Sequence, residues 1–404
     1  MATLNLYSSG SIQSQFCDNL LKTLPSNFEV CLFTNSGAEA NDLALQLARR
    51  YTGCDGVAVL ENAFHGAVKS VIEISPAALQ RQNLAIMPWV HVLPYPDTYR
   101  SPSSPSKVSE SEIVDTCFHE AKSILDKARK NGAKIGCFVS ETILVIQGVI
   151  VPPRNWLSKI YSYIRQIGGL VIADEIQTGM GRCGSHFWGF QSQGVIPDII
   201  TIGKPIGNGY PIAAVVTSRS IAQSIQNLHE EYLCCSVAAA VGKSVLDVLH
   251  EEKLMMNAEK MGHRLREGLH ILKHRHRWIG DVRGIGMITG LEIVWCKEEK
   301  RPAPEVTEKI CYRLREEHIL AENGGVYGNV VIFVPPLCLS VEDVTKILDI
   351  LNKIFCELEV SESEELYQLL GSQSESNESS SQEYRWQENL EGVIAGGSSY
   401  YSLD

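Results

Sequence analysis

Short apolar runs alternate with helical segments along the first half of the chain. A run without polar residues on either face is typical of a parallel strand that is buried on both sides. Residues 38–51, between the apolar runs at 30–34 and 56–60, have helical periodicity. The same periodicity returns at 113–130, where Ile113, Cys117 and Ala121 share one face. This alternation predicts an α/β fold with a large, doubly wound and mostly parallel sheet. The runs lie at residues 30–34, 56–60, 135–141, 170–173, 199–202 and 212–216.

The pattern changes after residue 237, where helical segments dominate as far as two strand candidates at 287–294 and 330–334. With a further helix at 341–355, this predicts a smaller C-terminal α+β domain over residues 250–358, after a large domain over 1–249. Residues 361–404 hold eleven serines and nine acidic residues against one basic residue. This composition predicts a disordered acidic tail, with a fraying helix near 364–370.

Composition and charge exclude several classes of protein. The net charge of −11 argues against a nucleic-acid partner, which would need a basic surface. The twelve cysteines form no CxxC pair, so we expect free thiols in a reducing compartment and neither a structural metal nor a disulfide scaffold. No apolar run is long enough to cross a membrane, and residues 1–10 do not resemble a secretory signal. We expect an intracellular protein without a membrane partner, in the cytoplasm or the mitochondrion.

Two charged residues follow buried runs. Asp174 comes directly after the run at 170–173, and Lys204 follows the run at 199–202, with glycines close behind it. Because the carboxyl ends of parallel strands meet at one edge of a sheet, both side chains are expected in the same crevice. Desolvation lowers the pKa of a lysine, which suits it to covalent chemistry with carbonyl compounds. Two ordinary surface charges beside loops are the alternative.

A candidate phosphate site lies upstream, where an apolar run, a glycine turn and a helical segment follow one another. The backbone N–H groups of Ser36, Gly37 and Ala38 would lie at the start of the helix, where anions bind readily. A routine turn with a helix N-cap is the alternative.

Two other segments match motifs without their usual context. Residues 179–184 fit G-x-G-x-x-G, but they do not open a helix directly after a strand, so a dinucleotide site is not expected. The sequence HRHR at 274–277 is more typical of a solvated basic patch than of a metal or anion site.

Three segments together resemble the class III aminotransferase family, a group of fold-type I enzymes that depend on pyridoxal 5'-phosphate (PLP). They are NSGAEAND at 35–42, DEIQTGMGR at 174–182 and IGKPIGNGYP at 202–211, and the resemblance covers about residues 19–355. It implies the fold-type I transferase architecture, PLP as the cofactor and a homodimer, since family members build the active site at the subunit interface.

The resemblance also implies a role for each matching residue. Lys204 would be the catalytic residue, which bonds to the cofactor and moves the proton. Asp174 would pair with the nitrogen of the cofactor ring and keep that ring an electron sink. Gln177 would lie near the phenolic oxygen, and Phe64 would stack on the ring. The phosphate would be held by the backbone N–H groups of Ser36, Gly37 and Ala38.

A narrower resemblance is to the phospho-lyase branch of this family. It rests on VHVLPYPDTYR at 90–100, HFWGFQ at 186–191 and PPLC at 335–338. The branch eliminates phosphate from a phosphorylated amine, phosphoethanolamine or 5-phosphohydroxy-L-lysine, and releases an aldehyde and ammonia. Ile332 stands where the family usually has an arginine that binds a substrate carboxylate, which favours a lyase. An ω-amine transaminase and a truncated, non-catalytic homologue are the alternatives.

Two departures from the family pattern bear on cofactor binding. Most of the family's N-terminal arm has no counterpart before residue 19. A stretch whose threonine reaches the partner subunit's cofactor phosphate should follow Tyr232, and the sequence instead runs through Cys234 into the helical segment at 237–249. The loss of one phosphate ligand predicts weaker retention of the cofactor.

Overall fold

The computed structural model describes residues 11–101, 109–225, 232 and 234–374, with side chains as far as residue 360. The chain divides into two compact units, Met1–Lys353 and Ile354–Asp404, and both sheets and all sites described below lie in the first unit. Residues 1–10, before which most of the family's N-terminal arm is expected to be missing, residue 233, where the expected deletion begins, and residues 375–404 of the predicted tail lie outside the described residues.

Seven strands form one large sheet in the order β1-β7-β6-β5-β4-β2-β3. Neighbouring strands run parallel except around β7, which is antiparallel to both β1 and β6. The predicted doubly wound, mostly parallel sheet is therefore confirmed, with one reversed strand that the pattern did not indicate. The strands are β1 (Val30–Thr34), β2 (Gly56–Leu60), β3 (Val90–Leu93), β4 (Ile135–Glu141), β5 (Leu170–Asp174), β6 (Ile199–Ile202) and β7 (Ala213–Thr217).

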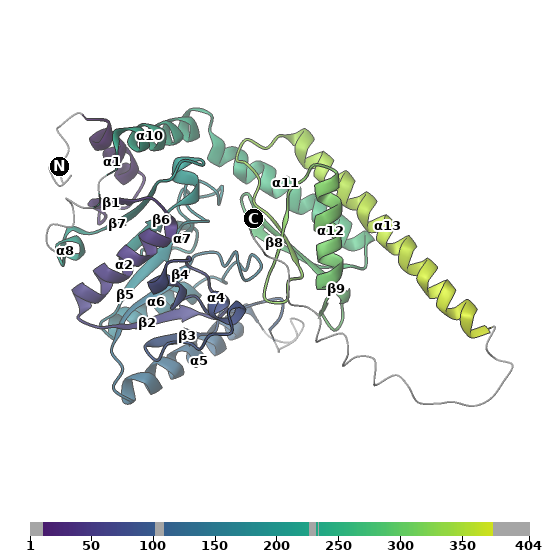
Figure 1. Cartoon of the computed structure of the whole chain (residues 1–404), viewed down its shortest axis with the longest axis horizontal. Coiled ribbons are helices and arrows are strands. Elements are labelled where there is room, and N and C mark those ends of the chain that lie inside the picture. Colours follow the sequence, from purple (N-terminus) through teal and green to yellow (C-terminus); the bar gives the residue numbers. More distant parts are fainter. Residues whose placement is uncertain (1–10, 102–108, 226–231, 233, 375–404) are drawn as a thin grey trace. The chain divides into compact units, whose positions relative to one another are not determined.

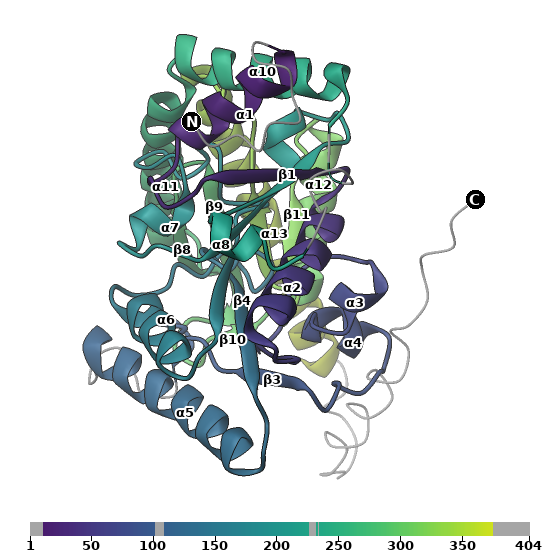
Figure 2. The same cartoon turned by 90° about the vertical axis from the view of Figure 1, so that its left-hand side faces the viewer.

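Helices cover both faces of this sheet, as Figures 1 and 2 show. Alternate residues along β2 belong to different cores: Val57 and Val59 pack with the α2 side, while Ala58 and Leu60 pack with the side of α5 and α6. This two-sided burial is the reason that the strands read as uninterrupted apolar runs. The helices of this part are α1 (Ile12–Lys22), α2 (Gly37–Thr52), α3 (Lys69–Ile72), α4 (Pro76–Arg81), α5 (Glu110–Lys130), α6 (Trp156–Gln166), α7 (Gly189–Ser192), α8 (Arg219–Ala222), α10 (Ser236–Glu251) and the 3-10 turn η1 (Lys204–Gly207).

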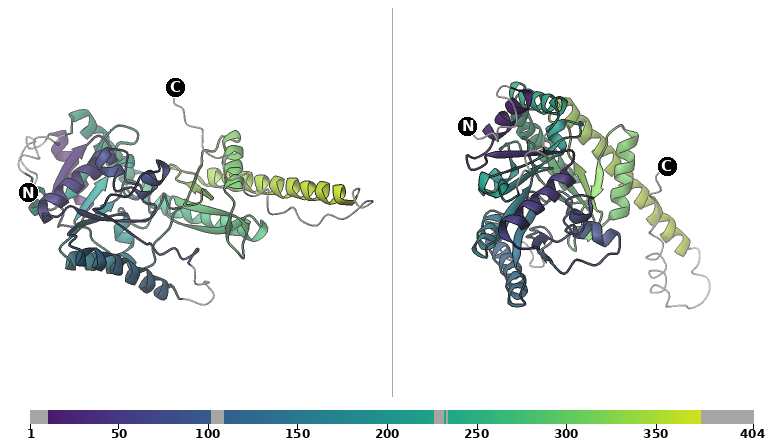
Figure 3. Two further views of the ribbon diagram at one scale, coloured as in Figure 1. Left: turned by 60° about the horizontal axis from the view of Figure 1, so that its bottom comes forward. Right: turned by 60° about the vertical axis from the view of Figure 1, so that its left-hand side comes forward.

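A smaller antiparallel sheet follows in the sequence, as the predicted α+β domain requires. Its central strand β9 pairs with β8, β10 and β12, and β12 pairs in turn with β11. Two helices, α11 (Leu254–Arg275) and α12 (Pro304–Glu316), pack against it, and Figure 3 gives two further views of this green part of the chain. A boundary at residue 249 stays a prediction. The strands are β8 (Ile279–Ile285), β9 (Ile288–Cys296), β10 (Arg301–Pro302), β11 (Glu322–Gly324) and β12 (Val330–Phe333).

The last helix is longer than predicted. Helix α13 spans Val341–Ser374, so it includes the helix predicted at 341–355 and the fraying helix predicted near 364–370, and it joins them through residues otherwise expected to start a disordered tail. Leucines at 366, 369 and 370 continue the helical spacing into this polar region. Among the helices of the described residues, none is both long and apolar enough to cross a membrane.

Candidate active site

The structure brings Asp174 and Lys204 to the same edge of the large sheet. Asp174 ends β5 and pairs in register with Thr201 of β6, and Lys204 begins the turn η1 two residues after β6 ends. Lys204 has a backbone φ of 24°, a strained value that the flanking strand and turn impose. Its side chain is open to a cavity, yet burial by its neighbours still lowers its pKa, against the opposing charges of Glu141 and Asp174.

Two side chains hold the buried carboxylate of Asp174. Oδ2 accepts hydrogen bonds from Nδ2 of Asn41 at 2.9 Å and pairs with Nδ1 of His65 at 2.7 Å. Oδ1 accepts the backbone N–H of Ile176 at 3.2 Å. Asn41 also donates to the carbonyl of His65 at 2.7 Å, and Ser75 Oγ accepts the N–H of His65 at 2.9 Å. These contacts fix the carboxylate and leave it a single orientation.

Sequence reasoning missed both of these partners. His65 directly follows Phe64 but matches no predicted role, and Asn41 appears only within the motif at 35–42. A signal was present for Asn41, which lies on the inner face of a helix among alanines and leucines, where a polar residue needs a partner. No local pattern indicates that its partner is Asp174, more than a hundred residues away.

Glu141 is a second buried carboxylate beside Asp174. The two residues are register partners on β4 and β5. Burial and the charge of Asp174 raise the pKa of Glu141, and its Oε1 has no hydrogen-bond partner among the described residues. Glu175, next in the chain, faces elsewhere: its carboxylate accepts four hydrogen bonds, from Thr142, Thr178 and two backbone N–H groups at the start of α7. Glu175 therefore anchors the fold.

The first turn of α2 has the geometry of the predicted anion cradle, and the binding of a phosphate there stays a prediction. Ser36 is the N-cap, and its Oγ accepts the N–H of Glu39 at 3.2 Å, so the N–H groups of Gly37 and Ala38 remain at the open end of the helix. A Cβ placed on Gly203 would lie 3.4 Å from Cα of Gly37. The start of α2 is therefore close to the backbone between the end of β6 and Lys204. A helix N-terminus in this position favours a phosphate.

Replacing Gly66 by alanine is expected to disturb this cradle. Gly66 has φ +137°, and an added Cβ would lie 2.6 Å from Cβ of Ala38 and 2.8 Å from its Cα. Strain and overlap together should lower the free energy of unfolding by about 2 to 4 kcal/mol, measured by urea denaturation.

Gly53→Ala is the matched control, at the other end of the same helix. Its φ is +65° and nothing lies within 4 Å of the added carbon, so about 1 kcal/mol is expected. Equal losses in the two variants would contradict the close approach.

Phe64 and Gln177 lie near the same edge. Phe64 directly precedes His65, and Gln177 lies in the turn that follows Asp174; both side chains are half-buried. Their roles toward a cofactor ring stay predictions.

A cavity of about 950 Å³ opens around Lys204. Arg182 lines it, and Nη2 of Arg182 donates to the carbonyl of Pro335 at 2.6 Å. Burial lowers the pKa of Arg182 to about 10, and no carboxylate of the described residues forms an ion pair with it. Arg182 is thus a half-buried cation without an ion-pair partner among the described residues. The rest of the wall comes from Met180, from η1 and its following loop, from α10 with Glu252 and Leu254 after it, and from residues 336–338.

The residues at this edge fit PLP. A lysine with a lowered pKa suits covalent attachment to an aldehyde, a fixed carboxylate suits a protonated ring nitrogen, and a helix start suits a phosphate. The buried oxygens Oδ1 of Asn41 and Oε1 of Glu141 have no hydrogen-bond partner among the described residues, so they add hydrogen-bonding capacity for a ligand.

Comparison with known proteins agrees with this geometry. A family model described as Aminotransferase class-III matches residues 4–355. "Alanine--glyoxylate aminotransferase 2-like" of Drosophila melanogaster is 35% identical over 340 residues, which cover 83% of this chain and 69% of the relative. "Ethanolamine-phosphate phospho-lyase homolog 1" of Caenorhabditis elegans is 32% identical over 369 residues, covering 87% and 78%.

Solved structures give the same result. A phospholyase from Arthrobacter in complex with phosphoethanolamine superposes with a TM-score of 0.80 at 29% identity, covering 87% of this chain and 82% of its own. An omega transaminase from Pseudomonas jessenii in complex with PMP has a TM-score of 0.78 at 26% identity, covering 88% and 81%. The chain therefore belongs to the class III aminotransferase family and is a PLP-dependent enzyme.

Proposed function

We propose that the enzyme is a phospho-lyase, which eliminates phosphate from a small phosphorylated amine and releases an aldehyde and ammonia. The observation that carries this proposal is Arg182, a cation without an acidic partner among the described residues, in the cavity that holds Lys204. The similarity to a phospho-lyase homologue and to a phospholyase structure with phosphoethanolamine supports the same substrate class.

The position of Ile332 favours a phosphorylated amine over an amino acid. Ile332 is 6% exposed and pairs across β11 and β12 with Glu322. The negative charge of Glu322 acts to raise the pKa of Lys204. An apolar side chain and a carboxylate on this side offer no partner for a substrate carboxylate. A cation for the phosphate is available at Arg182.

Each residue of the site has its own role in the proposed reaction. Bound PLP would supply the electron sink for the pair left when a proton leaves the carbon that bears the amine. Lys204 Nζ accepts that proton, and its lowered pKa keeps more of it as free amine near neutral pH. The C–O bond to phosphate then breaks, and the phosphate leaves with the electron pair of that bond. Arg182 stabilises the departing anion. The carbon that carried the phosphate then takes up a proton, which Lys204 can return, and water replaces the nitrogen to give the aldehyde and ammonia. Asp174 would be held toward the ring nitrogen by Asn41 and His65.

The decisive assay supplies PLP and phosphoethanolamine, or 5-phosphohydroxy-L-lysine, without any amino acceptor. A lyase releases phosphate and ammonia over many turnovers. An ω-amine transaminase, the second candidate supported by the Pseudomonas jessenii structure, converts its cofactor to the amine form once and then needs an acceptor. Absence of phosphate release from either compound, with the cofactor bound, rejects the lyase. A protein without an imine absorbance band that borohydride can trap is the non-catalytic homologue.

Replacing Arg182 by glutamine is expected to raise KM for the phosphorylated amine by about 10- to 100-fold, since a charged hydrogen bond to the phosphate is lost. Steady-state phosphate release measures the effect. Arg165→Gln is the control, because Arg165 pairs with Asp198 away from the cavity. An unchanged KM in Arg182→Gln would show that Arg182 does not bind the phosphate of the substrate.

Homodimerisation and an intracellular location, in the cytoplasm or the mitochondrion, belong to the same proposal. The twelve cysteines are free, and several are buried, which suits a reducing compartment. Sedimentation analysis of the purified chain tests the dimer.

A further inference from the structure

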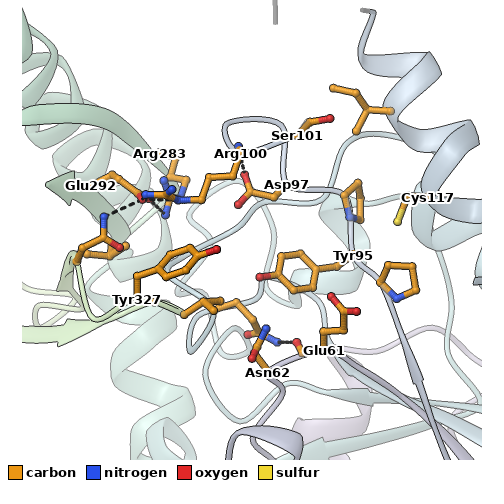
Figure 4. Close-up of a pocket in the computed structure, with 18 of the residues that line it drawn as sticks. Glu61, Asn62, Tyr95, Asp97, Arg100, Ser101, Cys117, Arg283, Glu292 and Tyr327 are labelled. Carbon is orange, nitrogen blue, oxygen red and sulfur yellow. Dashed lines mark hydrogen bonds and ion pairs between the residues drawn. The ribbon is translucent and has the colours of Figure 1, made fainter. Parts of the chain in front are cut away.

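A second cavity lies at the carboxyl ends of β2 and β3, against the smaller sheet. It has a volume of about 530 Å³, within the range of small-molecule sites, and Figure 4 shows its lining side chains. None of the predicted cofactor residues lines it. It therefore needs an explanation of its own.

The two arginines of this cavity are already neutralised. Arg100 donates to Oε1 of Glu292 through Nε at 2.8 Å and through Nη2, while its Nη1 donates to the carbonyl of Lys300 at 3.0 Å. Arg283 pairs with Oε2 of the same glutamate at 2.6 Å and with Asp281 at 3.3 Å, and its Nε donates to a backbone carbonyl. With every guanidinium nitrogen engaged, the cavity offers no cation to an anionic ligand.

The groups that remain are carboxylates. Asp97 Oδ1 accepts two backbone N–H groups, at 2.9 and 3.0 Å, and the side chain forms no ion pair among the described residues. Burial raises the pKa of Asp97, and burial together with the nearby charge of Glu120 raises that of Glu61. The lining of the cavity thus carries three carboxylates, at Glu61, Asp97 and Glu120, that no described cation neutralises by an ion pair.

A buried amide adds an independent observation. Gln147 lines the same cavity and is 3% exposed. Its Nε2 donates to the carbonyl of Glu61 at 3.3 Å, which identifies the other terminal atom as the acceptor. That atom, Oε1, has no hydrogen-bond partner among the described residues. A buried acceptor without a donor is unfavourable unless a ligand or a water supplies one.

We propose that this cavity binds an aliphatic diamine in its dicationic form. Ammonium groups supply the donors that Glu61, Asp97 and Gln147 lack. Tyr95 and Tyr327 point toward one another across the cavity in Figure 4 and supply apolar wall for the methylene chain, while the guanidinium of Arg100 lies 4.9 Å from the ring centroid of Tyr327. The site is distinct from the cavity of Lys204 and does not depend on the phospho-lyase reaction.

Isothermal titration of 1,5-diaminopentane into the full-length holoenzyme after borohydride reduction tests this, because the reduced link between the cofactor and Lys204 no longer exchanges with amines. One binding site is expected. Asp97→Asn and the double variant Glu61→Gln, Glu120→Gln should each weaken binding at least tenfold. Glu308→Gln, an exposed carboxylate of α12 away from the cavity, is the matched control and should bind as before. The double variant changes two exposed side chains, so it carries the test even if Asp97→Asn fails to fold.

Two ligands of the same length separate charge from shape. Neither 1,5-pentanediol nor pentanedioate should bind. Tighter binding of pentanedioate than of the diamine would overturn the proposal, as would the absence of diamine binding at millimolar concentration. Diamine binding that neither carboxylate variant weakens would overturn it as well.

Discussion

Lys204→Ala is expected to lower the rate of phosphate release from the phosphorylated amine by about 10³- to 10⁴-fold. The wild-type lysine combines strand-end placement with a strained backbone and a pKa lowered by burial, which makes its amine a better proton acceptor than an exposed lysine. No other lysine lines this cavity. The variant should also lose the imine absorbance band and its trapping by borohydride.

Two comparisons make this result specific. Lys309→Ala, on the exposed face of α12, should keep full activity and the absorbance band. Added methylamine should restore part of the activity of Lys204→Ala, because a small amine can enter the open cavity and accept the proton. Phosphate release from the variant within tenfold of wild type would show that another group removes the proton.

Asp174→Asn is expected to lower kcat by about 10²- to 10³-fold, because an amide no longer supplies the negative charge that stabilises a protonated ring nitrogen. Asparagine has nearly the same size, but its single oxygen can replace only one of the two carboxylate oxygens, either Oδ2, which accepts from Asn41, or Oδ1, which accepts from Ile176. The change therefore removes charge and largely preserves shape. Stopped-flow spectra and steady-state rates, with saturating PLP, measure the effect.

Stability and cofactor affinity must be followed in the same variant. Asp198→Asn is the control, since Asp198 is a partly buried carboxylate that accepts a backbone N–H at 2.8 Å far from the cavity. It should lose stability and keep its kcat. A normal kcat in Asp174→Asn would mean that the cofactor ring does not rely on this carboxylate.

The apolar strands could be predicted from the sequence because a strand that is buried on both faces has an uninterrupted run of apolar residues. The segments at 30–34 and 135–141 have the predicted bounds. Strand β3 was missed because it lies at the edge of the sheet, where His91 and Val92 are only half-buried. The direction of β7 could not be read either, since its composition is that of its parallel neighbours.

The candidate site likewise contains some residues that the sequence predicts and others that only the structure reveals. Lys204, Asp174 and the turn at Ser36 follow directly after strands, so local sequence predicts where they go. Asn41 and His65 hold Asp174 through contacts that exist only after α2, β2 and β5 have packed together. Side-chain orientation across elements therefore had to come from the structure.

The place of β1 in the sheet has a consequence for synthesis. Thr34 pairs with Ala213, and α1 packs on α10, so the N-terminal elements find their partners only after most of the large sheet has been made. At ribosomal rates the wait is roughly 10 to 40 s. During that time Leu32 and Phe33, which are 2% and 3% exposed in the finished fold, lack their register partners Val215 and Ala214 on β7. The nascent N-terminus should therefore bind chaperones, and translation that stops before β7 should leave an aggregation-prone chain.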